Sequence, residues 1–499
     1  MIKSKKINFL KNSVWSFLIS FFSRLGGLIF MIIIARFLLP EKFGVYTLAM
    51  STTLILLAIL DTGFNQTLIK FTSKYIEKDK KKAASVSNYL FNFKLNTSLI
   101  ISIALLISSY PLSYLLFNKP DLFMPLIFAS LYLFITSITT FFSSLFYSIE
   151  KVKYIATKEI LFEVVRIFLV IIMFLVVATQ HHVMGIISVL IFSNIVLIFY
   201  LRFNLKKESP ELFKNQVIQI NRKKINRFTI FLGIIGTFSI IFAYIDTIII
   251  GMFLESKYIG FYAAAMSLTV GIASLINISY ILLPFFTNLH SDDLERAVNS
   301  IMRYIFIITF PAIFGLAILS KYIIRLIYGY EYIPAVFPLY ILSLLILIQP
   351  MLGALVPLFY IREKTKQILI MTFVYTILNI FLNFIFIIWL LRFSPELAIS
   401  GAAIASILTQ GGYLISLMFY AKKDLSININ ISHMTKPIIS SLIMAGVLVI
   451  INFQIRDFNI FIGILNVITG ILVYFISMFL INGIGKPDIE ILKDFLKNI

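Results

Sequence analysis

Long apolar stretches follow one another along almost the whole chain, separated by short polar breaks. A helix needs roughly 20 apolar residues to cross the ~30 Å hydrocarbon core of a bilayer. The first stretch is longer than the core of a cleaved signal peptide, so we expect it to be retained. The pattern predicts an all-α integral membrane protein with fourteen transmembrane helices at 12–38, 43–69, 86–116, 122–147, 158–179, 183–204, 228–254, 258–288, 298–320, 335–360, 367–391, 397–421, 436–453 and 459–482.

Lys and Arg side chains are concentrated in alternate loops. With the N-terminus in the cytoplasm, the inner segments hold 32 of the 43 Lys and Arg residues and the outer loops hold 8. This asymmetry follows the positive-inside rule. It predicts a multi-pass protein of the cytoplasmic membrane with both termini in the cytoplasm. It also accounts for the formal net charge of +20, so we expect no nucleic-acid partner.

The composition excludes several classes of protein. Hydrophobic residues make up 60% of the chain and charged residues 13%, which is too apolar for a soluble protein of 499 residues. Cysteine is absent, which excludes disulfides, zinc–thiolate and iron–sulfur sites, and thiol nucleophiles. No phosphate-binding P-loop occurs, and the four histidines lack metal-ligand spacing. We therefore expect no enzymatic activity, no metal site and no resident cofactor.

An internal repeat relates the first six predicted spans to the next six. Phe43–Ser51 shares Gly, Tyr, Ala, Met and Ser in register with Ile259–Ser267. Tyr147–Lys153 matches Tyr360–Lys366, and both segments join the fourth and fifth helices of a six-helix unit. Two shorter matches, at nearly the same offset, pair Pro125–Leu131 with Pro338–Leu344 and Val183–Gly185 with Ile399–Gly401.

Since six is an even number, the two repeats enter the membrane in the same direction. We therefore predict an N-terminal six-helix bundle over residues 1–215, a second over 216–425, and helices thirteen and fourteen with a cytoplasmic tail over 426–499. Transporters use parallel repeats to enclose a central site that opens alternately to the two sides.

Several segments resemble signatures of one family. Asp246–Leu254 followed by Ile259–Ala265 resembles the seventh-to-eighth helix signature of polysaccharide flippases, and Asp61–Phe64 with Lys70–Phe71 resembles their second-helix signature. Ile327–Tyr332 resembles their ninth-to-tenth loop, and Gly401–Ser406 the start of their twelfth helix. The sequence is thus similar to the O-antigen and lipid-linked oligosaccharide flippases of the multidrug/oligosaccharidyl-lipid/polysaccharide exporter superfamily.

This resemblance implies two six-helix bundles in a V shape. It also implies export of a polyprenyl-(pyro)phosphate-linked oligosaccharide by alternating access, for polysaccharide biosynthesis. Membrane lipids, and a glycan polymerase or glycosyltransferases of the same pathway, are the expected partners. The resemblance leaves open the sugar, the mono- or pyrophosphate linkage and the bacterial or archaeal source. A lipid II flippase of the same superfamily is a close alternative.

Ionisable residues inside membrane spans are costly and mark candidate functional sites. Arg24 lies near the middle of the first span, beside a stripe formed by Ser13, Ser16, Ser20, Ser23 and Gly27. A polar stripe faces protein or a water-filled cavity rather than lipid. Arg24 is therefore predicted to bind a phosphate group, the alternative being a structural pair with a carboxylate such as Asp61.

Glu159, Glu163 and Arg166 share one face of the fifth span. Either Glu163 neutralises Arg166 within its own helix, or Arg166 binds substrate while a carboxylate exchanges a proton or Na⁺. Lys94 is a third candidate cation for the substrate, although it is close enough to the inner boundary to snorkel. Asp61 and Asp246 are candidates for ion coupling or gating, with a structural hydrogen bond as the alternative for Asp246.

Two other function classes remain to be separated from a flippase. An ion-coupled multidrug or organic-cation exporter would need carboxylates to bind its substrate, and the first span offers Arg24 and no acid. A membrane glycosyltransferase or polymerase would need a sizeable outer loop with catalytic residues, and every predicted outer loop is short.

Overall fold

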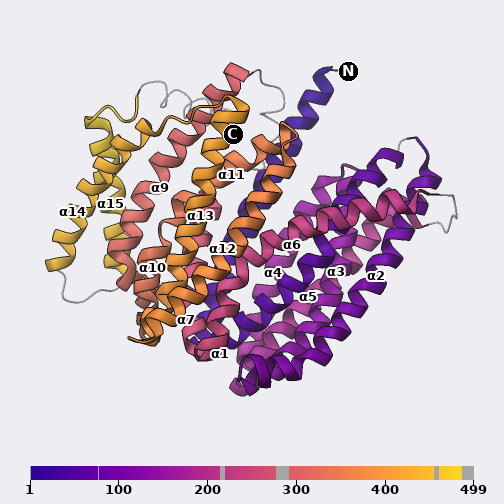
Figure 1. Cartoon of the computed structure of the whole chain (residues 1–499), viewed down its shortest axis with the longest axis horizontal. Helices are drawn as coiled ribbons and strands as arrows, with labels where there is room; N and C mark the ends of the chain where they lie inside the picture. Colours follow the sequence, from indigo (N-terminus) through magenta and orange to yellow (C-terminus); the bar gives the residue numbers. More distant parts are fainter. Residues whose placement is uncertain (1, 77, 214–219, 277–290, 455–459, 486–499) are drawn as a thin grey trace. The chain divides into compact units, whose positions relative to one another are not determined.

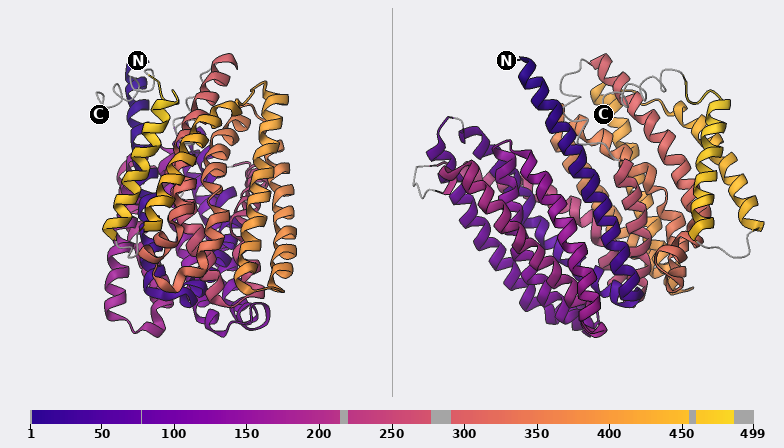
Figure 2. Two further views of the ribbon diagram at one scale, coloured as in Figure 1. Left: turned by 90° about the vertical axis from the view of Figure 1, so that its left-hand side faces the viewer. Right: turned by 180° about the vertical axis from the view of Figure 1, so that it is seen from behind.

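The computed structural model describes residues 2–76, 78–213, 220–276, 291–454 and 460–485, without the side chains of 2–21, 62, 291, 292, 454 and 460. This described part of the chain contains helices and loops and no strand (Figures 1 and 2). The expected all-α class is confirmed. Helices are the physical consequence of an apolar chain in a bilayer, because each backbone polar group finds its partner within the segment.

Two compact units divide the chain, and each is described by itself. The first comprises residues 1–264 and 369–409, and the second residues 265–368 and 410–499. Helices of the first unit are α1 (Ile2–Ile76), α2 (Lys80–Tyr110), α3 (Phe123–Ser148), α4 (Val152–Val176), α5 (His182–Glu208) and α6 (Arg222–Phe253). Those of the second are α9 (Ser291–Ile327), α10 (Val336–Leu342), α11 (Leu345–Ile361), α14 (Thr435–Gln454) and α15 (Ile460–Leu480). Three helices run through both units: α7 (Ser256–Ile276), α12 (Thr365–Leu391) and α13 (Pro395–Leu425).

Each of the fourteen predicted spans corresponds to helical structure. In the described part of the chain, eleven helices are long and apolar enough to cross a membrane, or twelve when α10 and α11, bent by 47°, count as one span. Helix α1 holds the first two predicted spans, and α4 is the fifth, whose apolar stretch carries Glu159, Glu163 and Arg166. The eighth predicted span is described as far as residue 276.

The two spans of α1 meet at Leu39, whose backbone has φ 60° and ψ 167°. Pro40 follows it and has no N–H to donate to the helix. Together these residues break the helical hydrogen bonding at the end of the first span.

The repeat is visible in the backbone of the two units. Glu150 and Glu363 stand at matched positions of the two repeats, and both adopt a left-handed conformation with φ 57°. In each case the next residue donates its N–H five residues back: Lys151 to Phe146 O at 3.1 Å, and Lys364 to Phe359 O at 2.8 Å. The fourth span of each repeat therefore ends in the same capping structure, as the matched sequences predict.

Small residues bring α1 and α6 into backbone contact within the first unit. A Cβ atom on Gly63 would lie 2.1 Å from the carbonyl oxygen of Thr229 and 2.9 Å from the nitrogen of Gly233. One turn further along α1, Thr67 accepts a 3.0 Å hydrogen bond from the Thr229 hydroxyl. Close packing of this kind stabilises membrane helices, which gain little from the hydrophobic effect in lipid.

Helices α14 and α15 pack against α9 in the second unit, around Met444, Leu448 and Met478. The Tyr474 hydroxyl of α15 donates a 2.7 Å hydrogen bond to the carbonyl of Ile307 in α9. Pro311 stands four residues after Ile307 and cannot supply the usual helical N–H. Tyr474 therefore replaces the backbone donor that Pro311 removes.

We expect Tyr474→Phe to destabilise the protein by about 1–2 kcal/mol, because it leaves the buried Ile307 carbonyl without a donor. Thermal unfolding in detergent measures this loss. Tyr330→Phe is the matched control, since Tyr330 is 75% exposed. Equal melting temperatures for the two variants would contradict the assignment.

Candidate functional site: buried charges in the first unit

Arg166 and Glu163 form a close ion pair on α4. Arg166 donates from Nε to Glu163 Oε2 at 2.9 Å, and from Nη2 to Oε1 at 2.7 Å and Oε2 at 2.5 Å. Of the two interpretations drawn from the sequence, the pairing within one helix is therefore present. This pairing does not use the whole guanidinium, because its Nη1 group has no hydrogen-bond partner among the described residues.

Two aromatic rings pack against this ion pair, and Gly26 of α1 leaves room for it. The guanidinium carbon of Arg166 lies 4.4 Å from the ring centre of Phe30 and 4.8 Å from that of Phe162. A Cβ atom on Gly26 would lie 2.5 Å from Glu163 Oε2, so the absence of a side chain there makes room for the carboxylate. Arg166 is thus fixed in orientation, and its side chain remains 13% exposed.

Arg24 lies on α1, the helix that carries Gly26 and Gly27. It is partly buried, and it precedes Gly27 by three residues, which places the two about 60° apart around α1. A Cβ atom on Gly27 would be 3.6 Å from Arg166 Nη2. The α1 face near Arg24 is therefore directed toward the Arg166 end of α4. The serine stripe at 13, 16 and 20 lies outside the described side chains.

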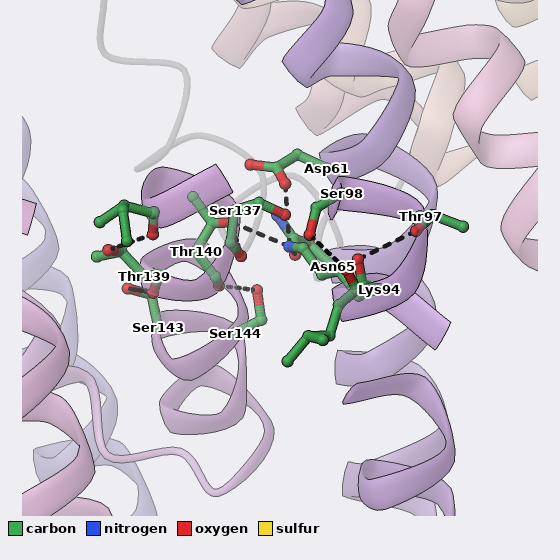
Figure 3. Close-up of polar contacts among 12 residues, drawn as sticks. Asp61, Asn65, Lys94, Thr97, Ser98, Ser137, Thr139, Thr140, Ser143 and Ser144 are labelled. Carbon is green, nitrogen blue, oxygen red and sulfur yellow. Dashed lines mark hydrogen bonds and ion pairs between the residues drawn. The ribbon is translucent and has the colours of Figure 1, made fainter. Parts of the chain in front are cut away.

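Lys94 is buried in a polar cluster between α1, α2 and α3 (Figure 3). Its Nζ lies 3.0 Å from Asp61 Oδ1, and it donates to Asn65 Oδ1 at 2.7 Å and to Thr140 Oγ1 at 3.0 Å. Lys94 thus makes two hydrogen bonds and one ion pair with the neighbouring helices. The expectation that Lys94 snorkels is wrong: the side chain is 3% exposed and turns inward to Asp61.

The same cluster corrects the suggested pairing of Asp61 with Arg24. The ion-pair partner of Asp61 is Lys94, on the neighbouring helix α2. This geometry favours a structural role for Lys94, and its assignment to substrate remains a prediction without support from its contacts. Asp61, with 17% of its side chain exposed, is the more accessible partner.

We expect Lys94→Met to cost about 3 kcal/mol of stability, because it leaves the Asp61 carboxylate without its buried counter-charge. The double variant Asp61→Asn/Lys94→Met should recover most of this loss, since it removes both charges. Thermal unfolding in detergent measures the two values. If the double variant is less stable than Lys94→Met, the pair is not the source of the effect.

Glu159 is bound less tightly than Glu163. Its Oε1 accepts a 2.8 Å hydrogen bond from Lys158, and its side chain is 22% exposed. Its predicted part in ion coupling is neither supported nor opposed by this contact.

Asp246 is the centre of a second polar cluster, near the C-terminal end of α6. Tyr262 of α7 donates to Asp246 Oδ2 at 2.6 Å, Asn383 of α12 donates to Oδ1 at 2.7 Å, and Ser406 of α13 donates to Oδ2. Asp246 is 2% exposed, and no Lys, Arg or His of the described chain forms an ion pair with it. Asp246 therefore accepts three hydrogen bonds, as the structural alternative drawn from the sequence allows.

Two further oxygen atoms of this cluster are unsatisfied. The carbonyl oxygens Asn379 Oδ1 and Asn383 Oδ1 are buried and have no hydrogen-bond donor among the described residues. The Asn379 amide donates instead to Thr409 Oγ1 at 3.1 Å. Carboxylate, amide and hydroxyl oxygens together are the ligands that a hard cation prefers. Among the described residues no group of three or more His, Cys, Asp or Glu is arranged to hold a metal ion.

The repeat relates the two clusters. With the offsets of the matched segments, Asn379 corresponds to Arg166, Asp246 to Phe30 and Tyr262 to Tyr46. At equivalent positions the first repeat therefore carries a cation packed on aromatic rings, and the second a carboxylate among amide and hydroxyl groups. Sequence reasoning named Arg166 and Asp246 but missed Asn379, Asn383, Tyr262 and Ser406 as their surroundings. The signal was available, because Asp246, Tyr262 and Ser406 stand in three different family-like segments.

Comparison with known proteins agrees with this architecture. The model of the family described as polysaccharide biosynthesis protein matches residues 9–290. An uncharacterized membrane protein of Methanocaldococcus jannaschii, MJ1068, is 25% identical over 304 residues, which are 56% of this chain and 59% of the relative's own length.

Solved structures extend the likeness to most of the chain. The lipid II flippase MurJ in an inward closed conformation aligns over 93% of this chain and 97% of its own, with a TM-score of 0.73 and 18% identity. An inward-facing multidrug resistance MATE family transporter of the MOP superfamily aligns over 83% and 94%, with a TM-score of 0.58 and 15% identity. A MOP superfamily transporter from Pyrococcus furiosus aligns over 84% and 95%, with a TM-score of 0.54 and 14% identity. At these identities the likeness establishes the fold.

Proposed function

Because the chain belongs to the polysaccharide biosynthesis protein family, we propose that it is a flippase that moves a polyprenyl-(pyro)phosphate-linked oligosaccharide across the cytoplasmic membrane. The observation that carries the proposal is the Arg166 guanidinium, fixed inside a membrane span with its Nη1 group unpaired in the described chain. Guanidinium groups bind phosphate oxygens through directional, charge-assisted hydrogen bonds. The sugar and the lipid chain do not require a buried cation for binding in the way that a phosphate does.

In the protein without substrate, the Glu163 carboxylate neutralises the charge of the Arg166 guanidinium. Without it, Arg166 would be an uncompensated charge within a membrane span, which is costly. The phosphate binds the Nη1 edge while Glu163 continues to hold Nε and Nη2. In this arrangement Arg24 supplies a second cation from α1, and the lipid chain remains in the bilayer.

Asp246 is the proposed coupling group. Its carboxylate is buried with hydrogen-bond donors and no counter-cation in the described chain, and two amide oxygens beside it lack donors. A proton or a Na⁺ ion would satisfy this cluster, and Asp246, Asn379 and Asn383 are the residues that would hold it. Binding and release of the ion then biases the two conformations of the transporter, as differential affinity requires.

The flippase hypothesis is tested in vesicles containing the purified protein and defined lipid-linked sugars, under imposed proton or Na⁺ gradients. We expect transfer of a pyrophosphate- or phosphate-linked oligosaccharide that depends on one gradient. An organic-cation exporter would instead move a cationic dye and leave the lipid-linked sugar in place. A lipid II flippase would move only the peptidoglycan precursor. Transfer of none of the anionic lipids would contradict the proposal.

The proposal includes a location and partners. The protein resides in the cytoplasmic membrane with both termini in the cytoplasm, and it passes its substrate to a glycan polymerase or glycosyltransferase of the same pathway. Reporter fusions after residues 40, 255 and 499 test the orientation: the first two fusion points should be external and the last internal.

A further inference from the structure

One end of the first unit has a hydrophobic core of its own, built where α1 ends and where α2 and α6 begin. Its buried side chains include Leu68, Phe71, Val86, Leu90 and Ile225. The turn at Pro210–Phe213 packs against α2 and adds Leu212 to this core. Apolar side chains inside and polar ones outside are typical of a protein in water, whereas a helix in lipid keeps apolar side chains on its surface.

Exposure along α2, which is described throughout, shows how far this end extends from the membrane. Large hydrophobic side chains of α2 are exposed only from Leu99 onward. Lys80 precedes Leu99 by 19 residues, or about 28 Å of helix. The headgroup layer is only about 5–8 Å thick, and charges in water are screened beyond about 8 Å at physiological salt. The start of α2 therefore lies beyond the lipid headgroups, even when the helix is tilted.

The exposed side chains of this end are strongly basic. Residues 70–82 and 210–227, as far as the structure describes them, contain two acids and ten cations. The ten cations, which we call the basic surface, are Lys70, Lys74, Lys78, Lys80, Lys81, Lys82, Arg222, Lys223, Lys224 and Arg227. Lys80 pairs with Glu211 at 2.9 Å. The other nine form no ion pair within the described part of the chain.

Aromatic rings fix some of these cations without neutralising them. The Lys70 ammonium lies 3.9 Å from the ring centre of Phe228, and the Arg222 guanidinium carbon lies 5.2 Å from that of Tyr89. The Tyr89 hydroxyl is itself held by a 2.8 Å hydrogen bond to Asn226 Oδ1. A cation on a ring keeps its full charge. The surface therefore presents ordered positive charge, at a cost in mutual repulsion.

Membrane topology alone does not require this charge. At the offset of the nearest matched segments, residues 70–82 of the first repeat correspond to 286–298 of the second. The first segment contains six cations and two acids, and the second contains one cation and three acids. Both are inner loops in the proposed topology, so the positive-inside rule would apply to both. The excess of cations belongs to the first repeat alone.

We propose that the basic surface is a docking site for an acidic protein on the cytoplasmic side. The inference rests on the proposed function for its orientation, which places this end of the first unit in the cytoplasm. Nine cations without counter-ions are complementary to a protein surface rich in Asp and Glu, and such complementarity speeds and orients association. Anionic lipids are the less suitable partner, because the start of α2 lies beyond their headgroups.

Peptide binding tests the charge complementarity without transport, so that failure of the flippase proposal is distinguishable. The probe is a fluorescent 20-residue polyglutamate peptide, added to the purified protein in phosphatidylcholine nanodiscs. Lys81→Glu/Lys223→Glu/Lys224→Glu should raise its Kd at least tenfold and weaken the dependence on salt. Lys366→Glu/Lys422→Glu/Lys423→Glu makes the same change in net charge at exposed positions of the second unit, and should change the Kd less than twofold. Equal effects of the two variants would overturn the proposal.

Photo-crosslinking in intact cells identifies what occupies the surface. A photo-reactive amino acid in place of Lys223 should form an adduct with a protein, and the same substitution of Lys422 should not. The crosslink should map to a segment rich in Asp and Glu, and Lys81→Glu/Lys224→Glu should reduce the adduct at least tenfold. Adducts with phospholipid alone, no adduct, or a protein adduct that survives the charge reversal would each overturn the proposal.

Discussion

Replacing Arg166 by Gln should lower transport of a lipid-linked oligosaccharide about 30- to 100-fold in vesicles, per molecule of folded protein. The expected loss corresponds to about 2–3 kcal/mol, the contribution of hydrogen bonds to a charged group. Gln retains some of the packing between Phe30 and Phe162 but offers no positive charge to the phosphate. The measurement is the initial rate of transfer, normalised to the amount of folded protein.

Two matched variants separate charge from geometry at this site. Arg166→Lys keeps the charge but loses the planar fork, so we expect an intermediate rate. Glu163→Gln removes the counter-charge and keeps Arg166, so the affinity for an anionic headgroup should rise rather than fall. If Arg166→Gln transports as well as the unaltered protein, phosphate recognition must be assigned to another residue, and Arg24 is then the next to be tested in the same way.

Replacing Asp246 by Asn should uncouple transport from the ion gradient. The neutral side chain still occupies the space between Tyr262, Asn383 and Ser406, but it cannot alternate between a charged and a neutralised state. We expect the gradient-driven rate to fall at least tenfold, to the level measured without a gradient, whereas slow equilibration of the substrate persists. The measurement compares transfer with and without an imposed proton or Na⁺ gradient in the same vesicle preparation.

Asn383→Ala and Thr140→Ala provide the comparison for this uncoupling. Asn383 contacts Asp246 directly, so its loss should weaken the response to the gradient. Thr140 contacts Lys94 in the other cluster, so its loss should leave that response unchanged. An Asp246→Asn protein that still accumulates substrate in proportion to the gradient would exclude Asp246 as the coupling group.

The snorkelling alternative for Lys94 fails for a reason that applies to many membrane helices. The sequence gives the depth of Lys94 along its own helix, and so its distance to the membrane boundary. The direction of the side chain depends on what the neighbouring helices offer, and here α1 and α3 offer Asp61, Asn65 and Thr140. The rotation of α2 about its own axis, relative to those helices, determines whether the Lys94 ammonium contacts lipid headgroups or protein.

Hydropathy, loop charge and self-similarity were sufficient for the fourteen spans, the pairing of the two repeats and the choice of Arg166 and Asp246 as unusual buried charges. These features are local or periodic. Because exposing polar groups to lipid is costly, they can be recognised from the order of residues along the chain. Which charges neutralise one another, which amide oxygens surround Asp246, and why Gly63 must be a glycine are decided only by tertiary structure. Those facts depend on the distance and rotation between helices that lie far apart in the sequence, and hydropathy along the chain carries no information about either quantity.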